Sequence, residues 1–372
     1  MIKKVLVLTI AMMLALGAFG QGGLEDALKD MLESNGKLYL QPMTDAFGAN
    51  MNSGWYHRSR VHKMLGFDLS FKSMFALIPS EASTFNFVMS ENQFNIPISE
   101  LGLGSVPDLP LSFAMLYADQ DTAAPTVFGG DGNTLQVNNA VVTGEILAHL
   151  HQNGVDTTLV PGIRSTVSAF VGDTTKISNF KLPDGVVELG DIPFPIIMPQ
   201  LAIGLPMGIE VTARGIPEVE LKVDGADIGS FSALGLGVRM NIDQFIPIPL
   251  FPVDITAGAA FQSVSLTADD QELLKTMNTS INMQVGKSLS LLFFGLGVYA
   301  DVAYETSSID IAYTAEFEGV EQDIEFSTSV DPGLRYGAGL HLTFIPLTYV
   351  NVAYSMTPTN DVITIGAGIS LR

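Results

Sequence analysis

The sequence contains no cysteine. Disulfides, thiolate metal sites and cysteine nucleophiles are therefore excluded, and so is a lipoprotein anchor, which needs a cysteine at its cleavage point. Basic residues are also scarce, because 18 Lys and Arg face 39 Asp and Glu and leave a formal net charge of −21. This balance argues against a nucleic-acid partner, since binding phosphate requires clustered positive charge.

Long apolar runs are missing from the mature part of the chain, although 47% of its residues are hydrophobic and the mean hydropathy is +0.33. Charged residues make up only 15% of the chain, against about 25% in typical soluble proteins. Hydrophobicity spread over many short segments is typical of a transmembrane β-barrel. The alternative is an exported soluble lipid-binding β protein, whose outer face should be rich in polar side chains.

Residues 1–20 have the features of a secretory signal peptide. Lys3 and Lys4 precede an uncharged apolar run, and Ala18 and Gly20 are the small residues that signal peptidase reads. The run is shorter than the roughly 20 residues of a membrane-spanning helix. We therefore expect export and a final location in the outer membrane of a Gram-negative cell.

Eight segments of the C-terminal half alternate apolar residues with small or polar ones. They are residues 201–214, 234–242, 253–262, 277–286, 292–302, 334–344, 350–356 and 363–371. Successive side chains of a strand point to opposite faces, so each segment has one apolar side. With residues 65–77, 84–89 and 163–171 as further candidates, the pattern predicts an all-β fold, a transmembrane antiparallel β-barrel of about 12–14 strands.

Three acidic connections, residues 215–229, 267–276 and 305–331, are longer than the turn at residues 345–346. Outer loops of such barrels are long and periplasmic turns are short, so the acidic connections should lie outside the cell. Their tips either bind divalent cations that bridge to lipopolysaccharide or form a solvated surface. Residues 309–317 alternate as well and could extend the strands above the membrane.

A short N-terminal helical hatch, residues 21–62, is expected before a barrel of residues 63–372 with a long insert around residues 91–195. Trp55 and Tyr56 either belong to a plug in the lumen or anchor the membrane interface. The helix is predicted to stop at Asn35-Gly36, and a second one could follow Pro42. Its apolar face consists of Leu24, Leu28, Met31 and Leu32.

Ser53-Gly54-Trp55-Tyr56 and Leu65-Gly66-Phe67-Asp68 resemble the opening of a family of uncharacterised outer-membrane barrels common in Bacteroidota. Residues 192–214 and 231–244 are similar to a later part of the same family, and the resemblance covers most of the mature chain. The layout of this family is similar to that of FadL-type transporters of hydrophobic compounds. The Asn-Pro-Ala-Gly signature of FadL-type hatches is absent from the chain.

The sequence contains no catalytic motif: a nucleophile elbow and a phosphate-binding loop are both missing. We expect no enzymatic activity, no cofactor and no metal site, since His149 and His151 share a predicted strand face without a third ligand. The residues expected to face the lumen are Glu210, Arg214, Arg239, Asp254, Asp301, Arg335 and His341. They either line a polar passage or close the interior by ion pairs.

These observations lead to an outer-membrane barrel for passive transport or diffusion of small solutes, hydrophobic ones among them. A structural or surface-interaction barrel with a filled lumen is the alternative in the membrane. The expected partners are outer-membrane lipid and lipopolysaccharide, the barrel-assembly machinery and a small hydrophobic solute.

Overall fold

The structure is a computed structural model, and it describes residues 24–102, 106–158, 161–173, 177, 179–185, 194–223, 226–246, 252–268, 271–290, 294–317, 320–344 and 347–371. The predicted signal peptide lies outside these residues. The chain forms two compact units. The barrel unit comprises Met43–Pro79, Leu189–Ala312 and Glu325–Arg372, and the insert unit comprises Met1–Pro42, Ser80–Glu188 and Tyr313–Ile324.

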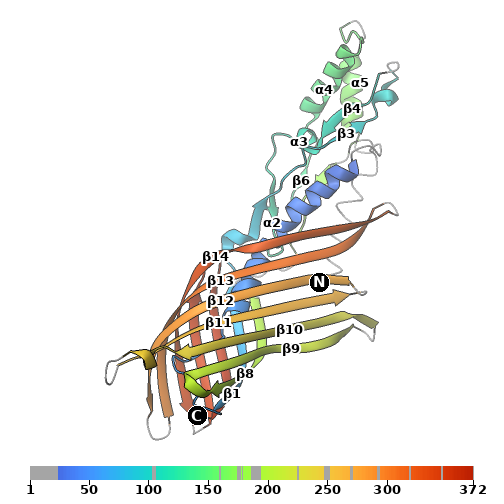
Figure 1. The fold of residues 1–372 in the computed structure, drawn as a ribbon. Coiled ribbons are helices and arrows are strands. Elements are labelled where there is room, and N and C mark those ends of the chain that lie inside the picture. Colours follow the sequence, from blue (N-terminus) through green and yellow to red (C-terminus); the bar gives the residue numbers. More distant parts are fainter. Residues whose placement is uncertain are drawn as a thin grey trace. The chain divides into compact units, whose positions relative to one another are not determined.

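The barrel unit is a closed antiparallel barrel of ten strands in the order β1-β16-β15-β14-β13-β12-β11-β10-β9-β8 (Figure 1). β1 closes the wall by pairing with β16 on one edge and with β8 on the other. The strands are β1 (Phe67–Leu77), β8 (Phe194–Leu205), β9 (Ile209–Val223), β10 (Ala226–Asn241), β11 (Asp254–Ala268), β12 (Gln271–Ser290), β13 (Phe294–Phe317), β14 (Val320–Phe344), β15 (Thr348–Met356) and β16 (Asp361–Leu371). The predicted fold class, an antiparallel barrel preceded by a helical segment, is confirmed.

The number of barrel strands is smaller than the 12–14 expected from the sequence. Residues 163–171 belong to the helix α5 (Ile163–Gly172), whose buried residues Ile163, Val167 and Val171 recur every fourth position. Strand alternation would bury Ser165 and Ala169 on the same face, but both are exposed, so the period is helical. Residues 84–89 contribute only the short strand β2 (Thr84–Asn86), which pairs with β5 (Ala123–Pro125) in the insert unit.

The three acidic connections are strand hairpins rather than irregular loops. Residues 215–229 lie in β9 and β10, residues 267–276 in β11 and β12, and residues 305–331 in β13 and β14, apart from turn residues that are not described. β13 and β14 are long because their alternation continues beyond the segments that the sequence assigned to the membrane. The expected extension of the strands at residues 309–317 is thus present.

The two faces of the wall differ in polarity, as β14 illustrates. Leu340 is 50% exposed on the outside, whereas the neighbouring His341 is only 3% exposed and points inward. Leu334, Tyr336 and Phe344 share the outward face with Leu340, and each is about half exposed. Large apolar side chains outside and polar ones inside are the reverse of what a soluble domain shows.

The helix α2 (Leu24–Asn52) passes through Asn35, Gly36 and Pro42, where the sequence predicts a stop and a second helix. The Asn35 amide explains the first difference, because it donates to Val88 O and accepts from Val88 N at 2.8 and 2.7 Å instead of ending the helix. Among the described residues, no helix has the length and hydropathy of a membrane-spanning helix.

The insert unit contains its own hydrophobic core, and the chain reaches it from β1 and leaves it for β8. Its core packs Phe94 against Phe113 and Phe180 against Tyr117, together with residues of the helix α4 (Asn139–Gln152). The remaining elements are η1 (Ser80–Ser83), β3 (Gln93–Ile96), η2 (Ile98–Leu101), β4 (Leu109–Ser112), α3 (Phe113–Leu116), β6 (Thr134–Leu135) and β7 (Phe180–Lys181).

The first half of α2 is part of this unit. The Tyr39 hydroxyl donates to Asp184 O at 3.0 Å. Burial, with the nearby Asp184 carboxylate adding to it, raises the pKa of Tyr39 to about 12. His149 and His151 lie on α4 rather than on a strand, so two positions of separation turn them away from each other.

Candidate functional site

The lumen of the barrel is occupied by the chain itself. The last turns of α2 and the following residues 53–66, which we call the plug, run from one end of the barrel to the other before β1 begins. At one end, the Asn50 amide donates to Phe194 O at 2.8 Å. At the other end, Leu65 N donates to Gly204 O at 2.9 Å, and Gly204 N donates to Gly66 O at 2.8 Å. The plug therefore spans the length of β8.

Residues 53–66 of the plug form no regular helix or strand, so their backbone needs partners from elsewhere. Inward-facing side chains of the wall supply them. The Gln200 amide donates to Trp55 O at 2.9 Å, and the Gln284 amide donates to Tyr56 O at 3.3 Å. Val61 N donates to Asn241 Oδ1 at 3.2 Å. The wall and the plug thus satisfy each other's polar groups.

Arg214 of β9 holds the start of the plug. Its guanidinium donates to Ser53 O at 2.6 Å and also to Met51 O, near the C-terminal end of α2. The last carbonyls of a helix lack intrahelical partners and carry its negative dipole end, so a cation is favourable there. The same guanidinium lies 3.9 Å from the centre of a Trp55 ring and bonds to Gln262.

Glu210 of β9 is the negative charge at the centre of a first buried cluster in the lumen. Its carboxylate forms an ion pair with Arg239 of β10 at 2.7 Å, accepts from His62 N at 2.9 Å and contacts His62 Nδ1 at 2.7 Å. Arg58 Nη2 lies 3.7 Å away. Arg239 in turn lies 4.7 Å from the ring centre of Tyr56. All these groups are buried, and buried charges are tolerated only when paired.

Lys72 of β1 occupies the middle of a second buried cluster. Its ammonium donates to Asn351 Oδ1 at 2.8 Å and to the Tyr349 hydroxyl at 3.3 Å, and it lies 3.2 Å from His57 Nδ1. The Tyr349 hydroxyl donates to Asp68 Oδ1 at 2.8 Å. The His57 ring stacks on Tyr349 with ring centres 4.6 Å apart. This cluster joins the plug to β1 and β15.

A third cluster surrounds Arg335 of β14. Its guanidinium pairs with Glu305 at 2.6 Å and with Asp301 at 2.8 Å, both on β13. A cavity of about 20 Å³ separates this cluster from Trp55 and Tyr56 of the plug. Such a volume holds about one water molecule, so the described residues leave no solute-sized passage at this point.

The seven lumen residues expected from the sequence are therefore found in two ion pairs and at three further positions. Glu210 pairs with Arg239, and Arg335 pairs with Asp301, whereas Arg214 binds the plug. His341 is buried, with its ring centre 5.0 Å from that of His57. Asp254 begins β11, is half-buried and enters no ion pair within the described part of the chain. Trp55 and Tyr56 lie inside the barrel and belong to the plug.

Sequence reasoning missed several lumen residues. Asp68 and Lys72 alternate with the outward-facing Leu69 and Phe71, so the period of two already placed them on the inner face. Glu305 was assigned to an outer loop because of the acids that follow it, yet it pairs with Arg335 inside the barrel. The plug residues His57, Arg58 and His62 carry no periodic signal.

Solved structures with a similar barrel share little sequence with this chain. The outer-membrane protease OmpT from Escherichia coli is 10% identical with a TM-score of 0.32, and the match covers 82% of this chain and 95% of OmpT. The attachment invasion locus protein Ail of Yersinia pestis is 15% identical with a TM-score of 0.21, covering 44% and 96%. The N-terminal barrel domain of Pseudomonas aeruginosa OprF is 12% identical with a TM-score of 0.20, covering 42% and 99%. Likeness at this level carries no argument about activity.

No curated protein shows significant sequence similarity to the chain. A family profile does match, and it spans residues 1–371, which is nearly the whole sequence. The FadL-type layout and an origin in Bacteroidota stay predictions. The chain belongs to the family of unknown function DUF6588.

Proposed function

We propose that this protein is an outer-membrane β-barrel that is closed by its own plug and carries the insert unit as a surface-interaction domain. The observation that carries this proposal is the filled lumen. Three buried polar clusters bind the plug or fill the space beside it, and the cavity between the Arg335 cluster and the plug has a volume of about 20 Å³. A barrel closed in this way serves as an anchor rather than as an open pore.

Placement in a membrane is supported by the outward face of the wall. Leu236, Ile281 and Leu340 on three different strands are 65%, 60% and 50% exposed. A soluble protein rarely exposes so continuous an apolar surface. Hydrogen bonds between the strands of a closed barrel also give backbone N–H and C=O groups the partners that lipid cannot supply.

Orientation follows from where the long connections leave the barrel. β1 begins at Phe67 beside Leu371 of β16, so both barrel termini share one end. The insert leaves from Leu77 and returns at Phe194, at the opposite end. Barrels of this kind keep short turns in the periplasm and longer connections outside, so we assign the insert to the cell surface.

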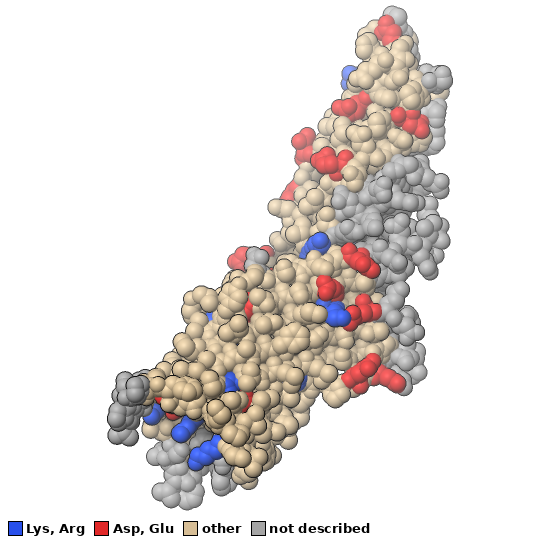
Figure 2. Space-filling view, in the orientation of Figure 1, with Lys and Arg blue, Asp and Glu red and all other residues tan. Residues whose placement is uncertain are grey.

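The negative charge on the surface of the insert unit restricts the charge that a docking partner can carry. Figure 2 shows Asp and Glu at many points of the insert unit and Lys or Arg at few. Glu91, Asp121 and Glu145 are among the described acids there, and the whole chain carries −21. A docking partner should therefore be neutral or basic, because an anionic surface would be repelled.

Fractionation and surface proteolysis test this proposal. We expect the folded protein in the outer-membrane fraction with a heat-modifiable gel band, and protease added to intact cells should cleave within residues 80–188. In planar bilayers the purified protein should show no steady conductance. Recovery in the soluble periplasmic fraction, or a permanently open channel, would contradict the proposal.

Gated diffusion of small solutes is the second candidate, and the irregular backbone of the plug favours it. A segment held mostly by side-chain bonds can leave the lumen without unfolding a strand. The chain has no cysteine, so a pair introduced at Gly48 and Ser307 is unique. A Cβ on Gly48 would lie 2.9 Å from Ser307 Cβ, which is closer than the spacing of about 3.8 Å in a disulfide, so the bond forms once the two backbones move apart by about 1 Å.

The double variant Gly48→Cys/Ser307→Cys separates the two candidates. If the plug moves to open the pore, conductance should be seen in the reduced form and be absent after oxidation. The single variant Ser307→Cys is the control, and oxidation should not alter it. If neither the oxidised nor the reduced form conducts, gated diffusion is rejected and the closed barrel remains as the function.

A further inference from the structure

The wall of the barrel has a seam between β8 and β9. Residues 200–205 of β8 pair with residues 209–214 of β9, and the ladder stops there. β8 nevertheless starts at Phe194 and stays paired with β1, while β9 continues to Val223 and stays paired with β10. Residues 194–199 therefore have no partner in β9, although both strands go on.

The sequence explains the seam. Pro195 and Pro199 lie on the unpartnered part of β8, and Pro217 lies on the corresponding part of β9. Proline has no N–H to give to a ladder and is confined to strand edges and bulges. Gly215 turns β9 toward β10 with a φ of 141°, and a Cβ there would lie within 2 Å of Ala233 O. The separation of the strands is thus built into the chain.

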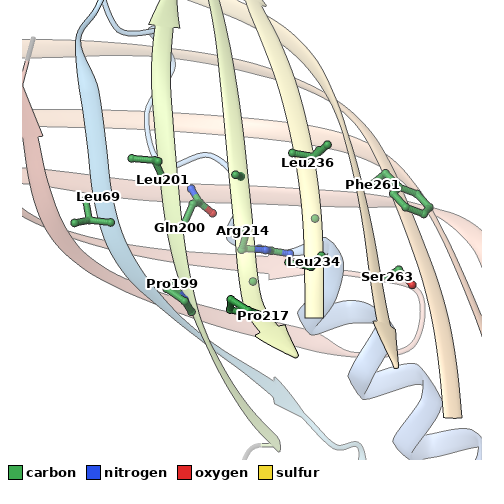
Figure 3. A pocket seen from close by; sticks show the side chains of 13 residues that line it. Leu69, Pro199, Gln200, Leu201, Arg214, Pro217, Leu234, Leu236, Phe261 and Ser263 are labelled. Atoms are coloured by element: carbon green, nitrogen blue, oxygen red, sulfur yellow. The ribbon is translucent and has the colours of Figure 1, made fainter. Parts of the chain in front are cut away.

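An apolar groove of about 580 Å³ lies on the outer side of the wall at this seam (Figure 3). Its sides are the outward-facing Leu69, Leu201, Leu234, Leu236 and Phe261, and its floor includes Gln200, Arg214 and Gly235. In Figure 3 the Gln200 and Arg214 side chains lie between strands that carry the apolar ones. Both point toward the lumen, so the groove reaches the inner layer of the wall. Its volume lies within the range of small-molecule sites, about 300–1,000 Å³.

We infer that this groove binds an acyl chain of a membrane lipid, which covers the seam from the bilayer side. The groove is continuous with the outward apolar face, as Leu236 and Leu234 on its rim are 65% and 60% exposed. Its outward-facing residues bear no charge, which suits a hydrocarbon chain and excludes a headgroup. Pro199 and Pro217 line the groove and have no N–H to leave unpaired, so a hydrocarbon chain can cover the seam at these positions without stranding a backbone donor.

The inference rests on the proposed placement in the outer membrane. It adds a defined lipid site directly over Gln200 and Arg214, which the wall and the plug already bury to 2% exposure each.

A natural reporter lies directly behind the groove. Trp55 is the only tryptophan of the chain, and a Cβ on Gly235 would lie 2.7 Å from Trp55 Cη2. Because Gly235 has no side chain, only the backbone of β10 separates the indole from the groove. An acyl chain labelled with bromine, which quenches indole fluorescence on close contact, should therefore quench Trp55 from the lipid side.

The experiment uses the full chain in vesicles of phosphatidylcholine brominated in the middle of one acyl chain, against unlabelled vesicles. We expect Trp55 emission to fall at least twofold. Ala213→Phe places a ring in the groove from the exposed face of β9 and should remove most of that quenching. Ala338→Phe makes the same change on the exposed face of β14, away from the groove, and should leave the quenching as in the unchanged protein.

Equal quenching in the two variants would overturn the inference, as would no quenching in the unchanged protein. Loss of quenching on adding a soluble alkyl compound at a concentration below that of the lipid would also overturn it, since the occupant would then be a solute. Heat-modifiable mobility of the same samples is the separate check on insertion. If that band is missing, the proposed function fails, whereas an inserted protein without quenching rejects only the lipid site.

Discussion

Trp55 lies with its ring 3.9 Å from the Arg214 guanidinium and with its edge against the backbone of Gly235. One residue of the plug thus contacts a wall cation and a wall glycine at once. Arg214 also donates to the carbonyls that end α2. The position of the indole therefore reports on both the plug and the wall.

Replacing Arg214 by Met should loosen the start of the plug. The change removes the donor to Ser53 O and one of two donors to Met51 O, which keeps the Trp55 indole N–H at 3.1 Å. A buried carbonyl left without a partner costs about 1–3 kcal/mol. We expect the free energy of unfolding in urea to fall by about 3 kcal/mol and Trp55 emission to shift to longer wavelength. Arg164→Met on the exposed face of α5 is the matched control and should change neither value.

The Glu210–Arg239 pair should show strong coupling. Glu210→Gln leaves the buried Arg239 without its counter-charge, and breaking a buried pair costs about 3–5 kcal/mol. The double variant Glu210→Gln/Arg239→Met removes both charges and should be less destabilised than the sum of the single changes. A double-mutant cycle of unfolding free energies measures this coupling. Additive single effects would mean that the two charges do not stabilise each other.

The period-two pattern was sufficient to predict the barrel but not its number of strands. Leu334–Phe344 alternates as expected, with Leu340 outside and His341 inside. The same rule overcounted because Ile163, Val167 and Val171 were taken for strand residues, although a spacing of four fits a helix. Short apolar segments satisfy both patterns, and only packing against α4 decides between them.

Residues of the plug could not be predicted in the same way. Lys72 occupies an inner strand position that alternation identifies, but its partner His57 lies in a segment without any period. Which of these groups meet depends on how residues 53–66 pass through the lumen. The seam could not be predicted from the sequence either. Pro199 and Pro217 can be read as strand breakers, but only the barrel shows that they lie on neighbouring strands.

Gly215 should be intolerant of any side chain. Its φ of 141° is a glycine conformation, and a Cβ there would lie within 2 Å of Ala233 O. Gly215→Ala should therefore prevent the heat-modifiable folded band from forming at 37 °C. Gly144→Ala on α4 is the control, because nothing lies within 4 Å of that Cβ, and it should stabilise its helix by about 1 kcal/mol. A folded Gly215→Ala protein would show that the bend at the seam is not required.

Arginine substitutions along the outward face of β14 should locate the membrane. Leu340 pairs with Val352 of β15, whereas Ser329 lies beyond Tyr336, the last residue of β14 that pairs with β15. Arginine on the lipid-facing side costs about 2–4 kcal/mol at the bilayer midplane and about 0–1 kcal/mol near the interface. In vesicles, Leu340→Arg should therefore lower the unfolding free energy several times more than Ser329→Arg does. In detergent micelles the difference should shrink, since a micelle adapts to a charge more easily than a bilayer. Equal losses at both positions in vesicles would place Leu340 in water and remove the physical basis for assigning this barrel to a membrane.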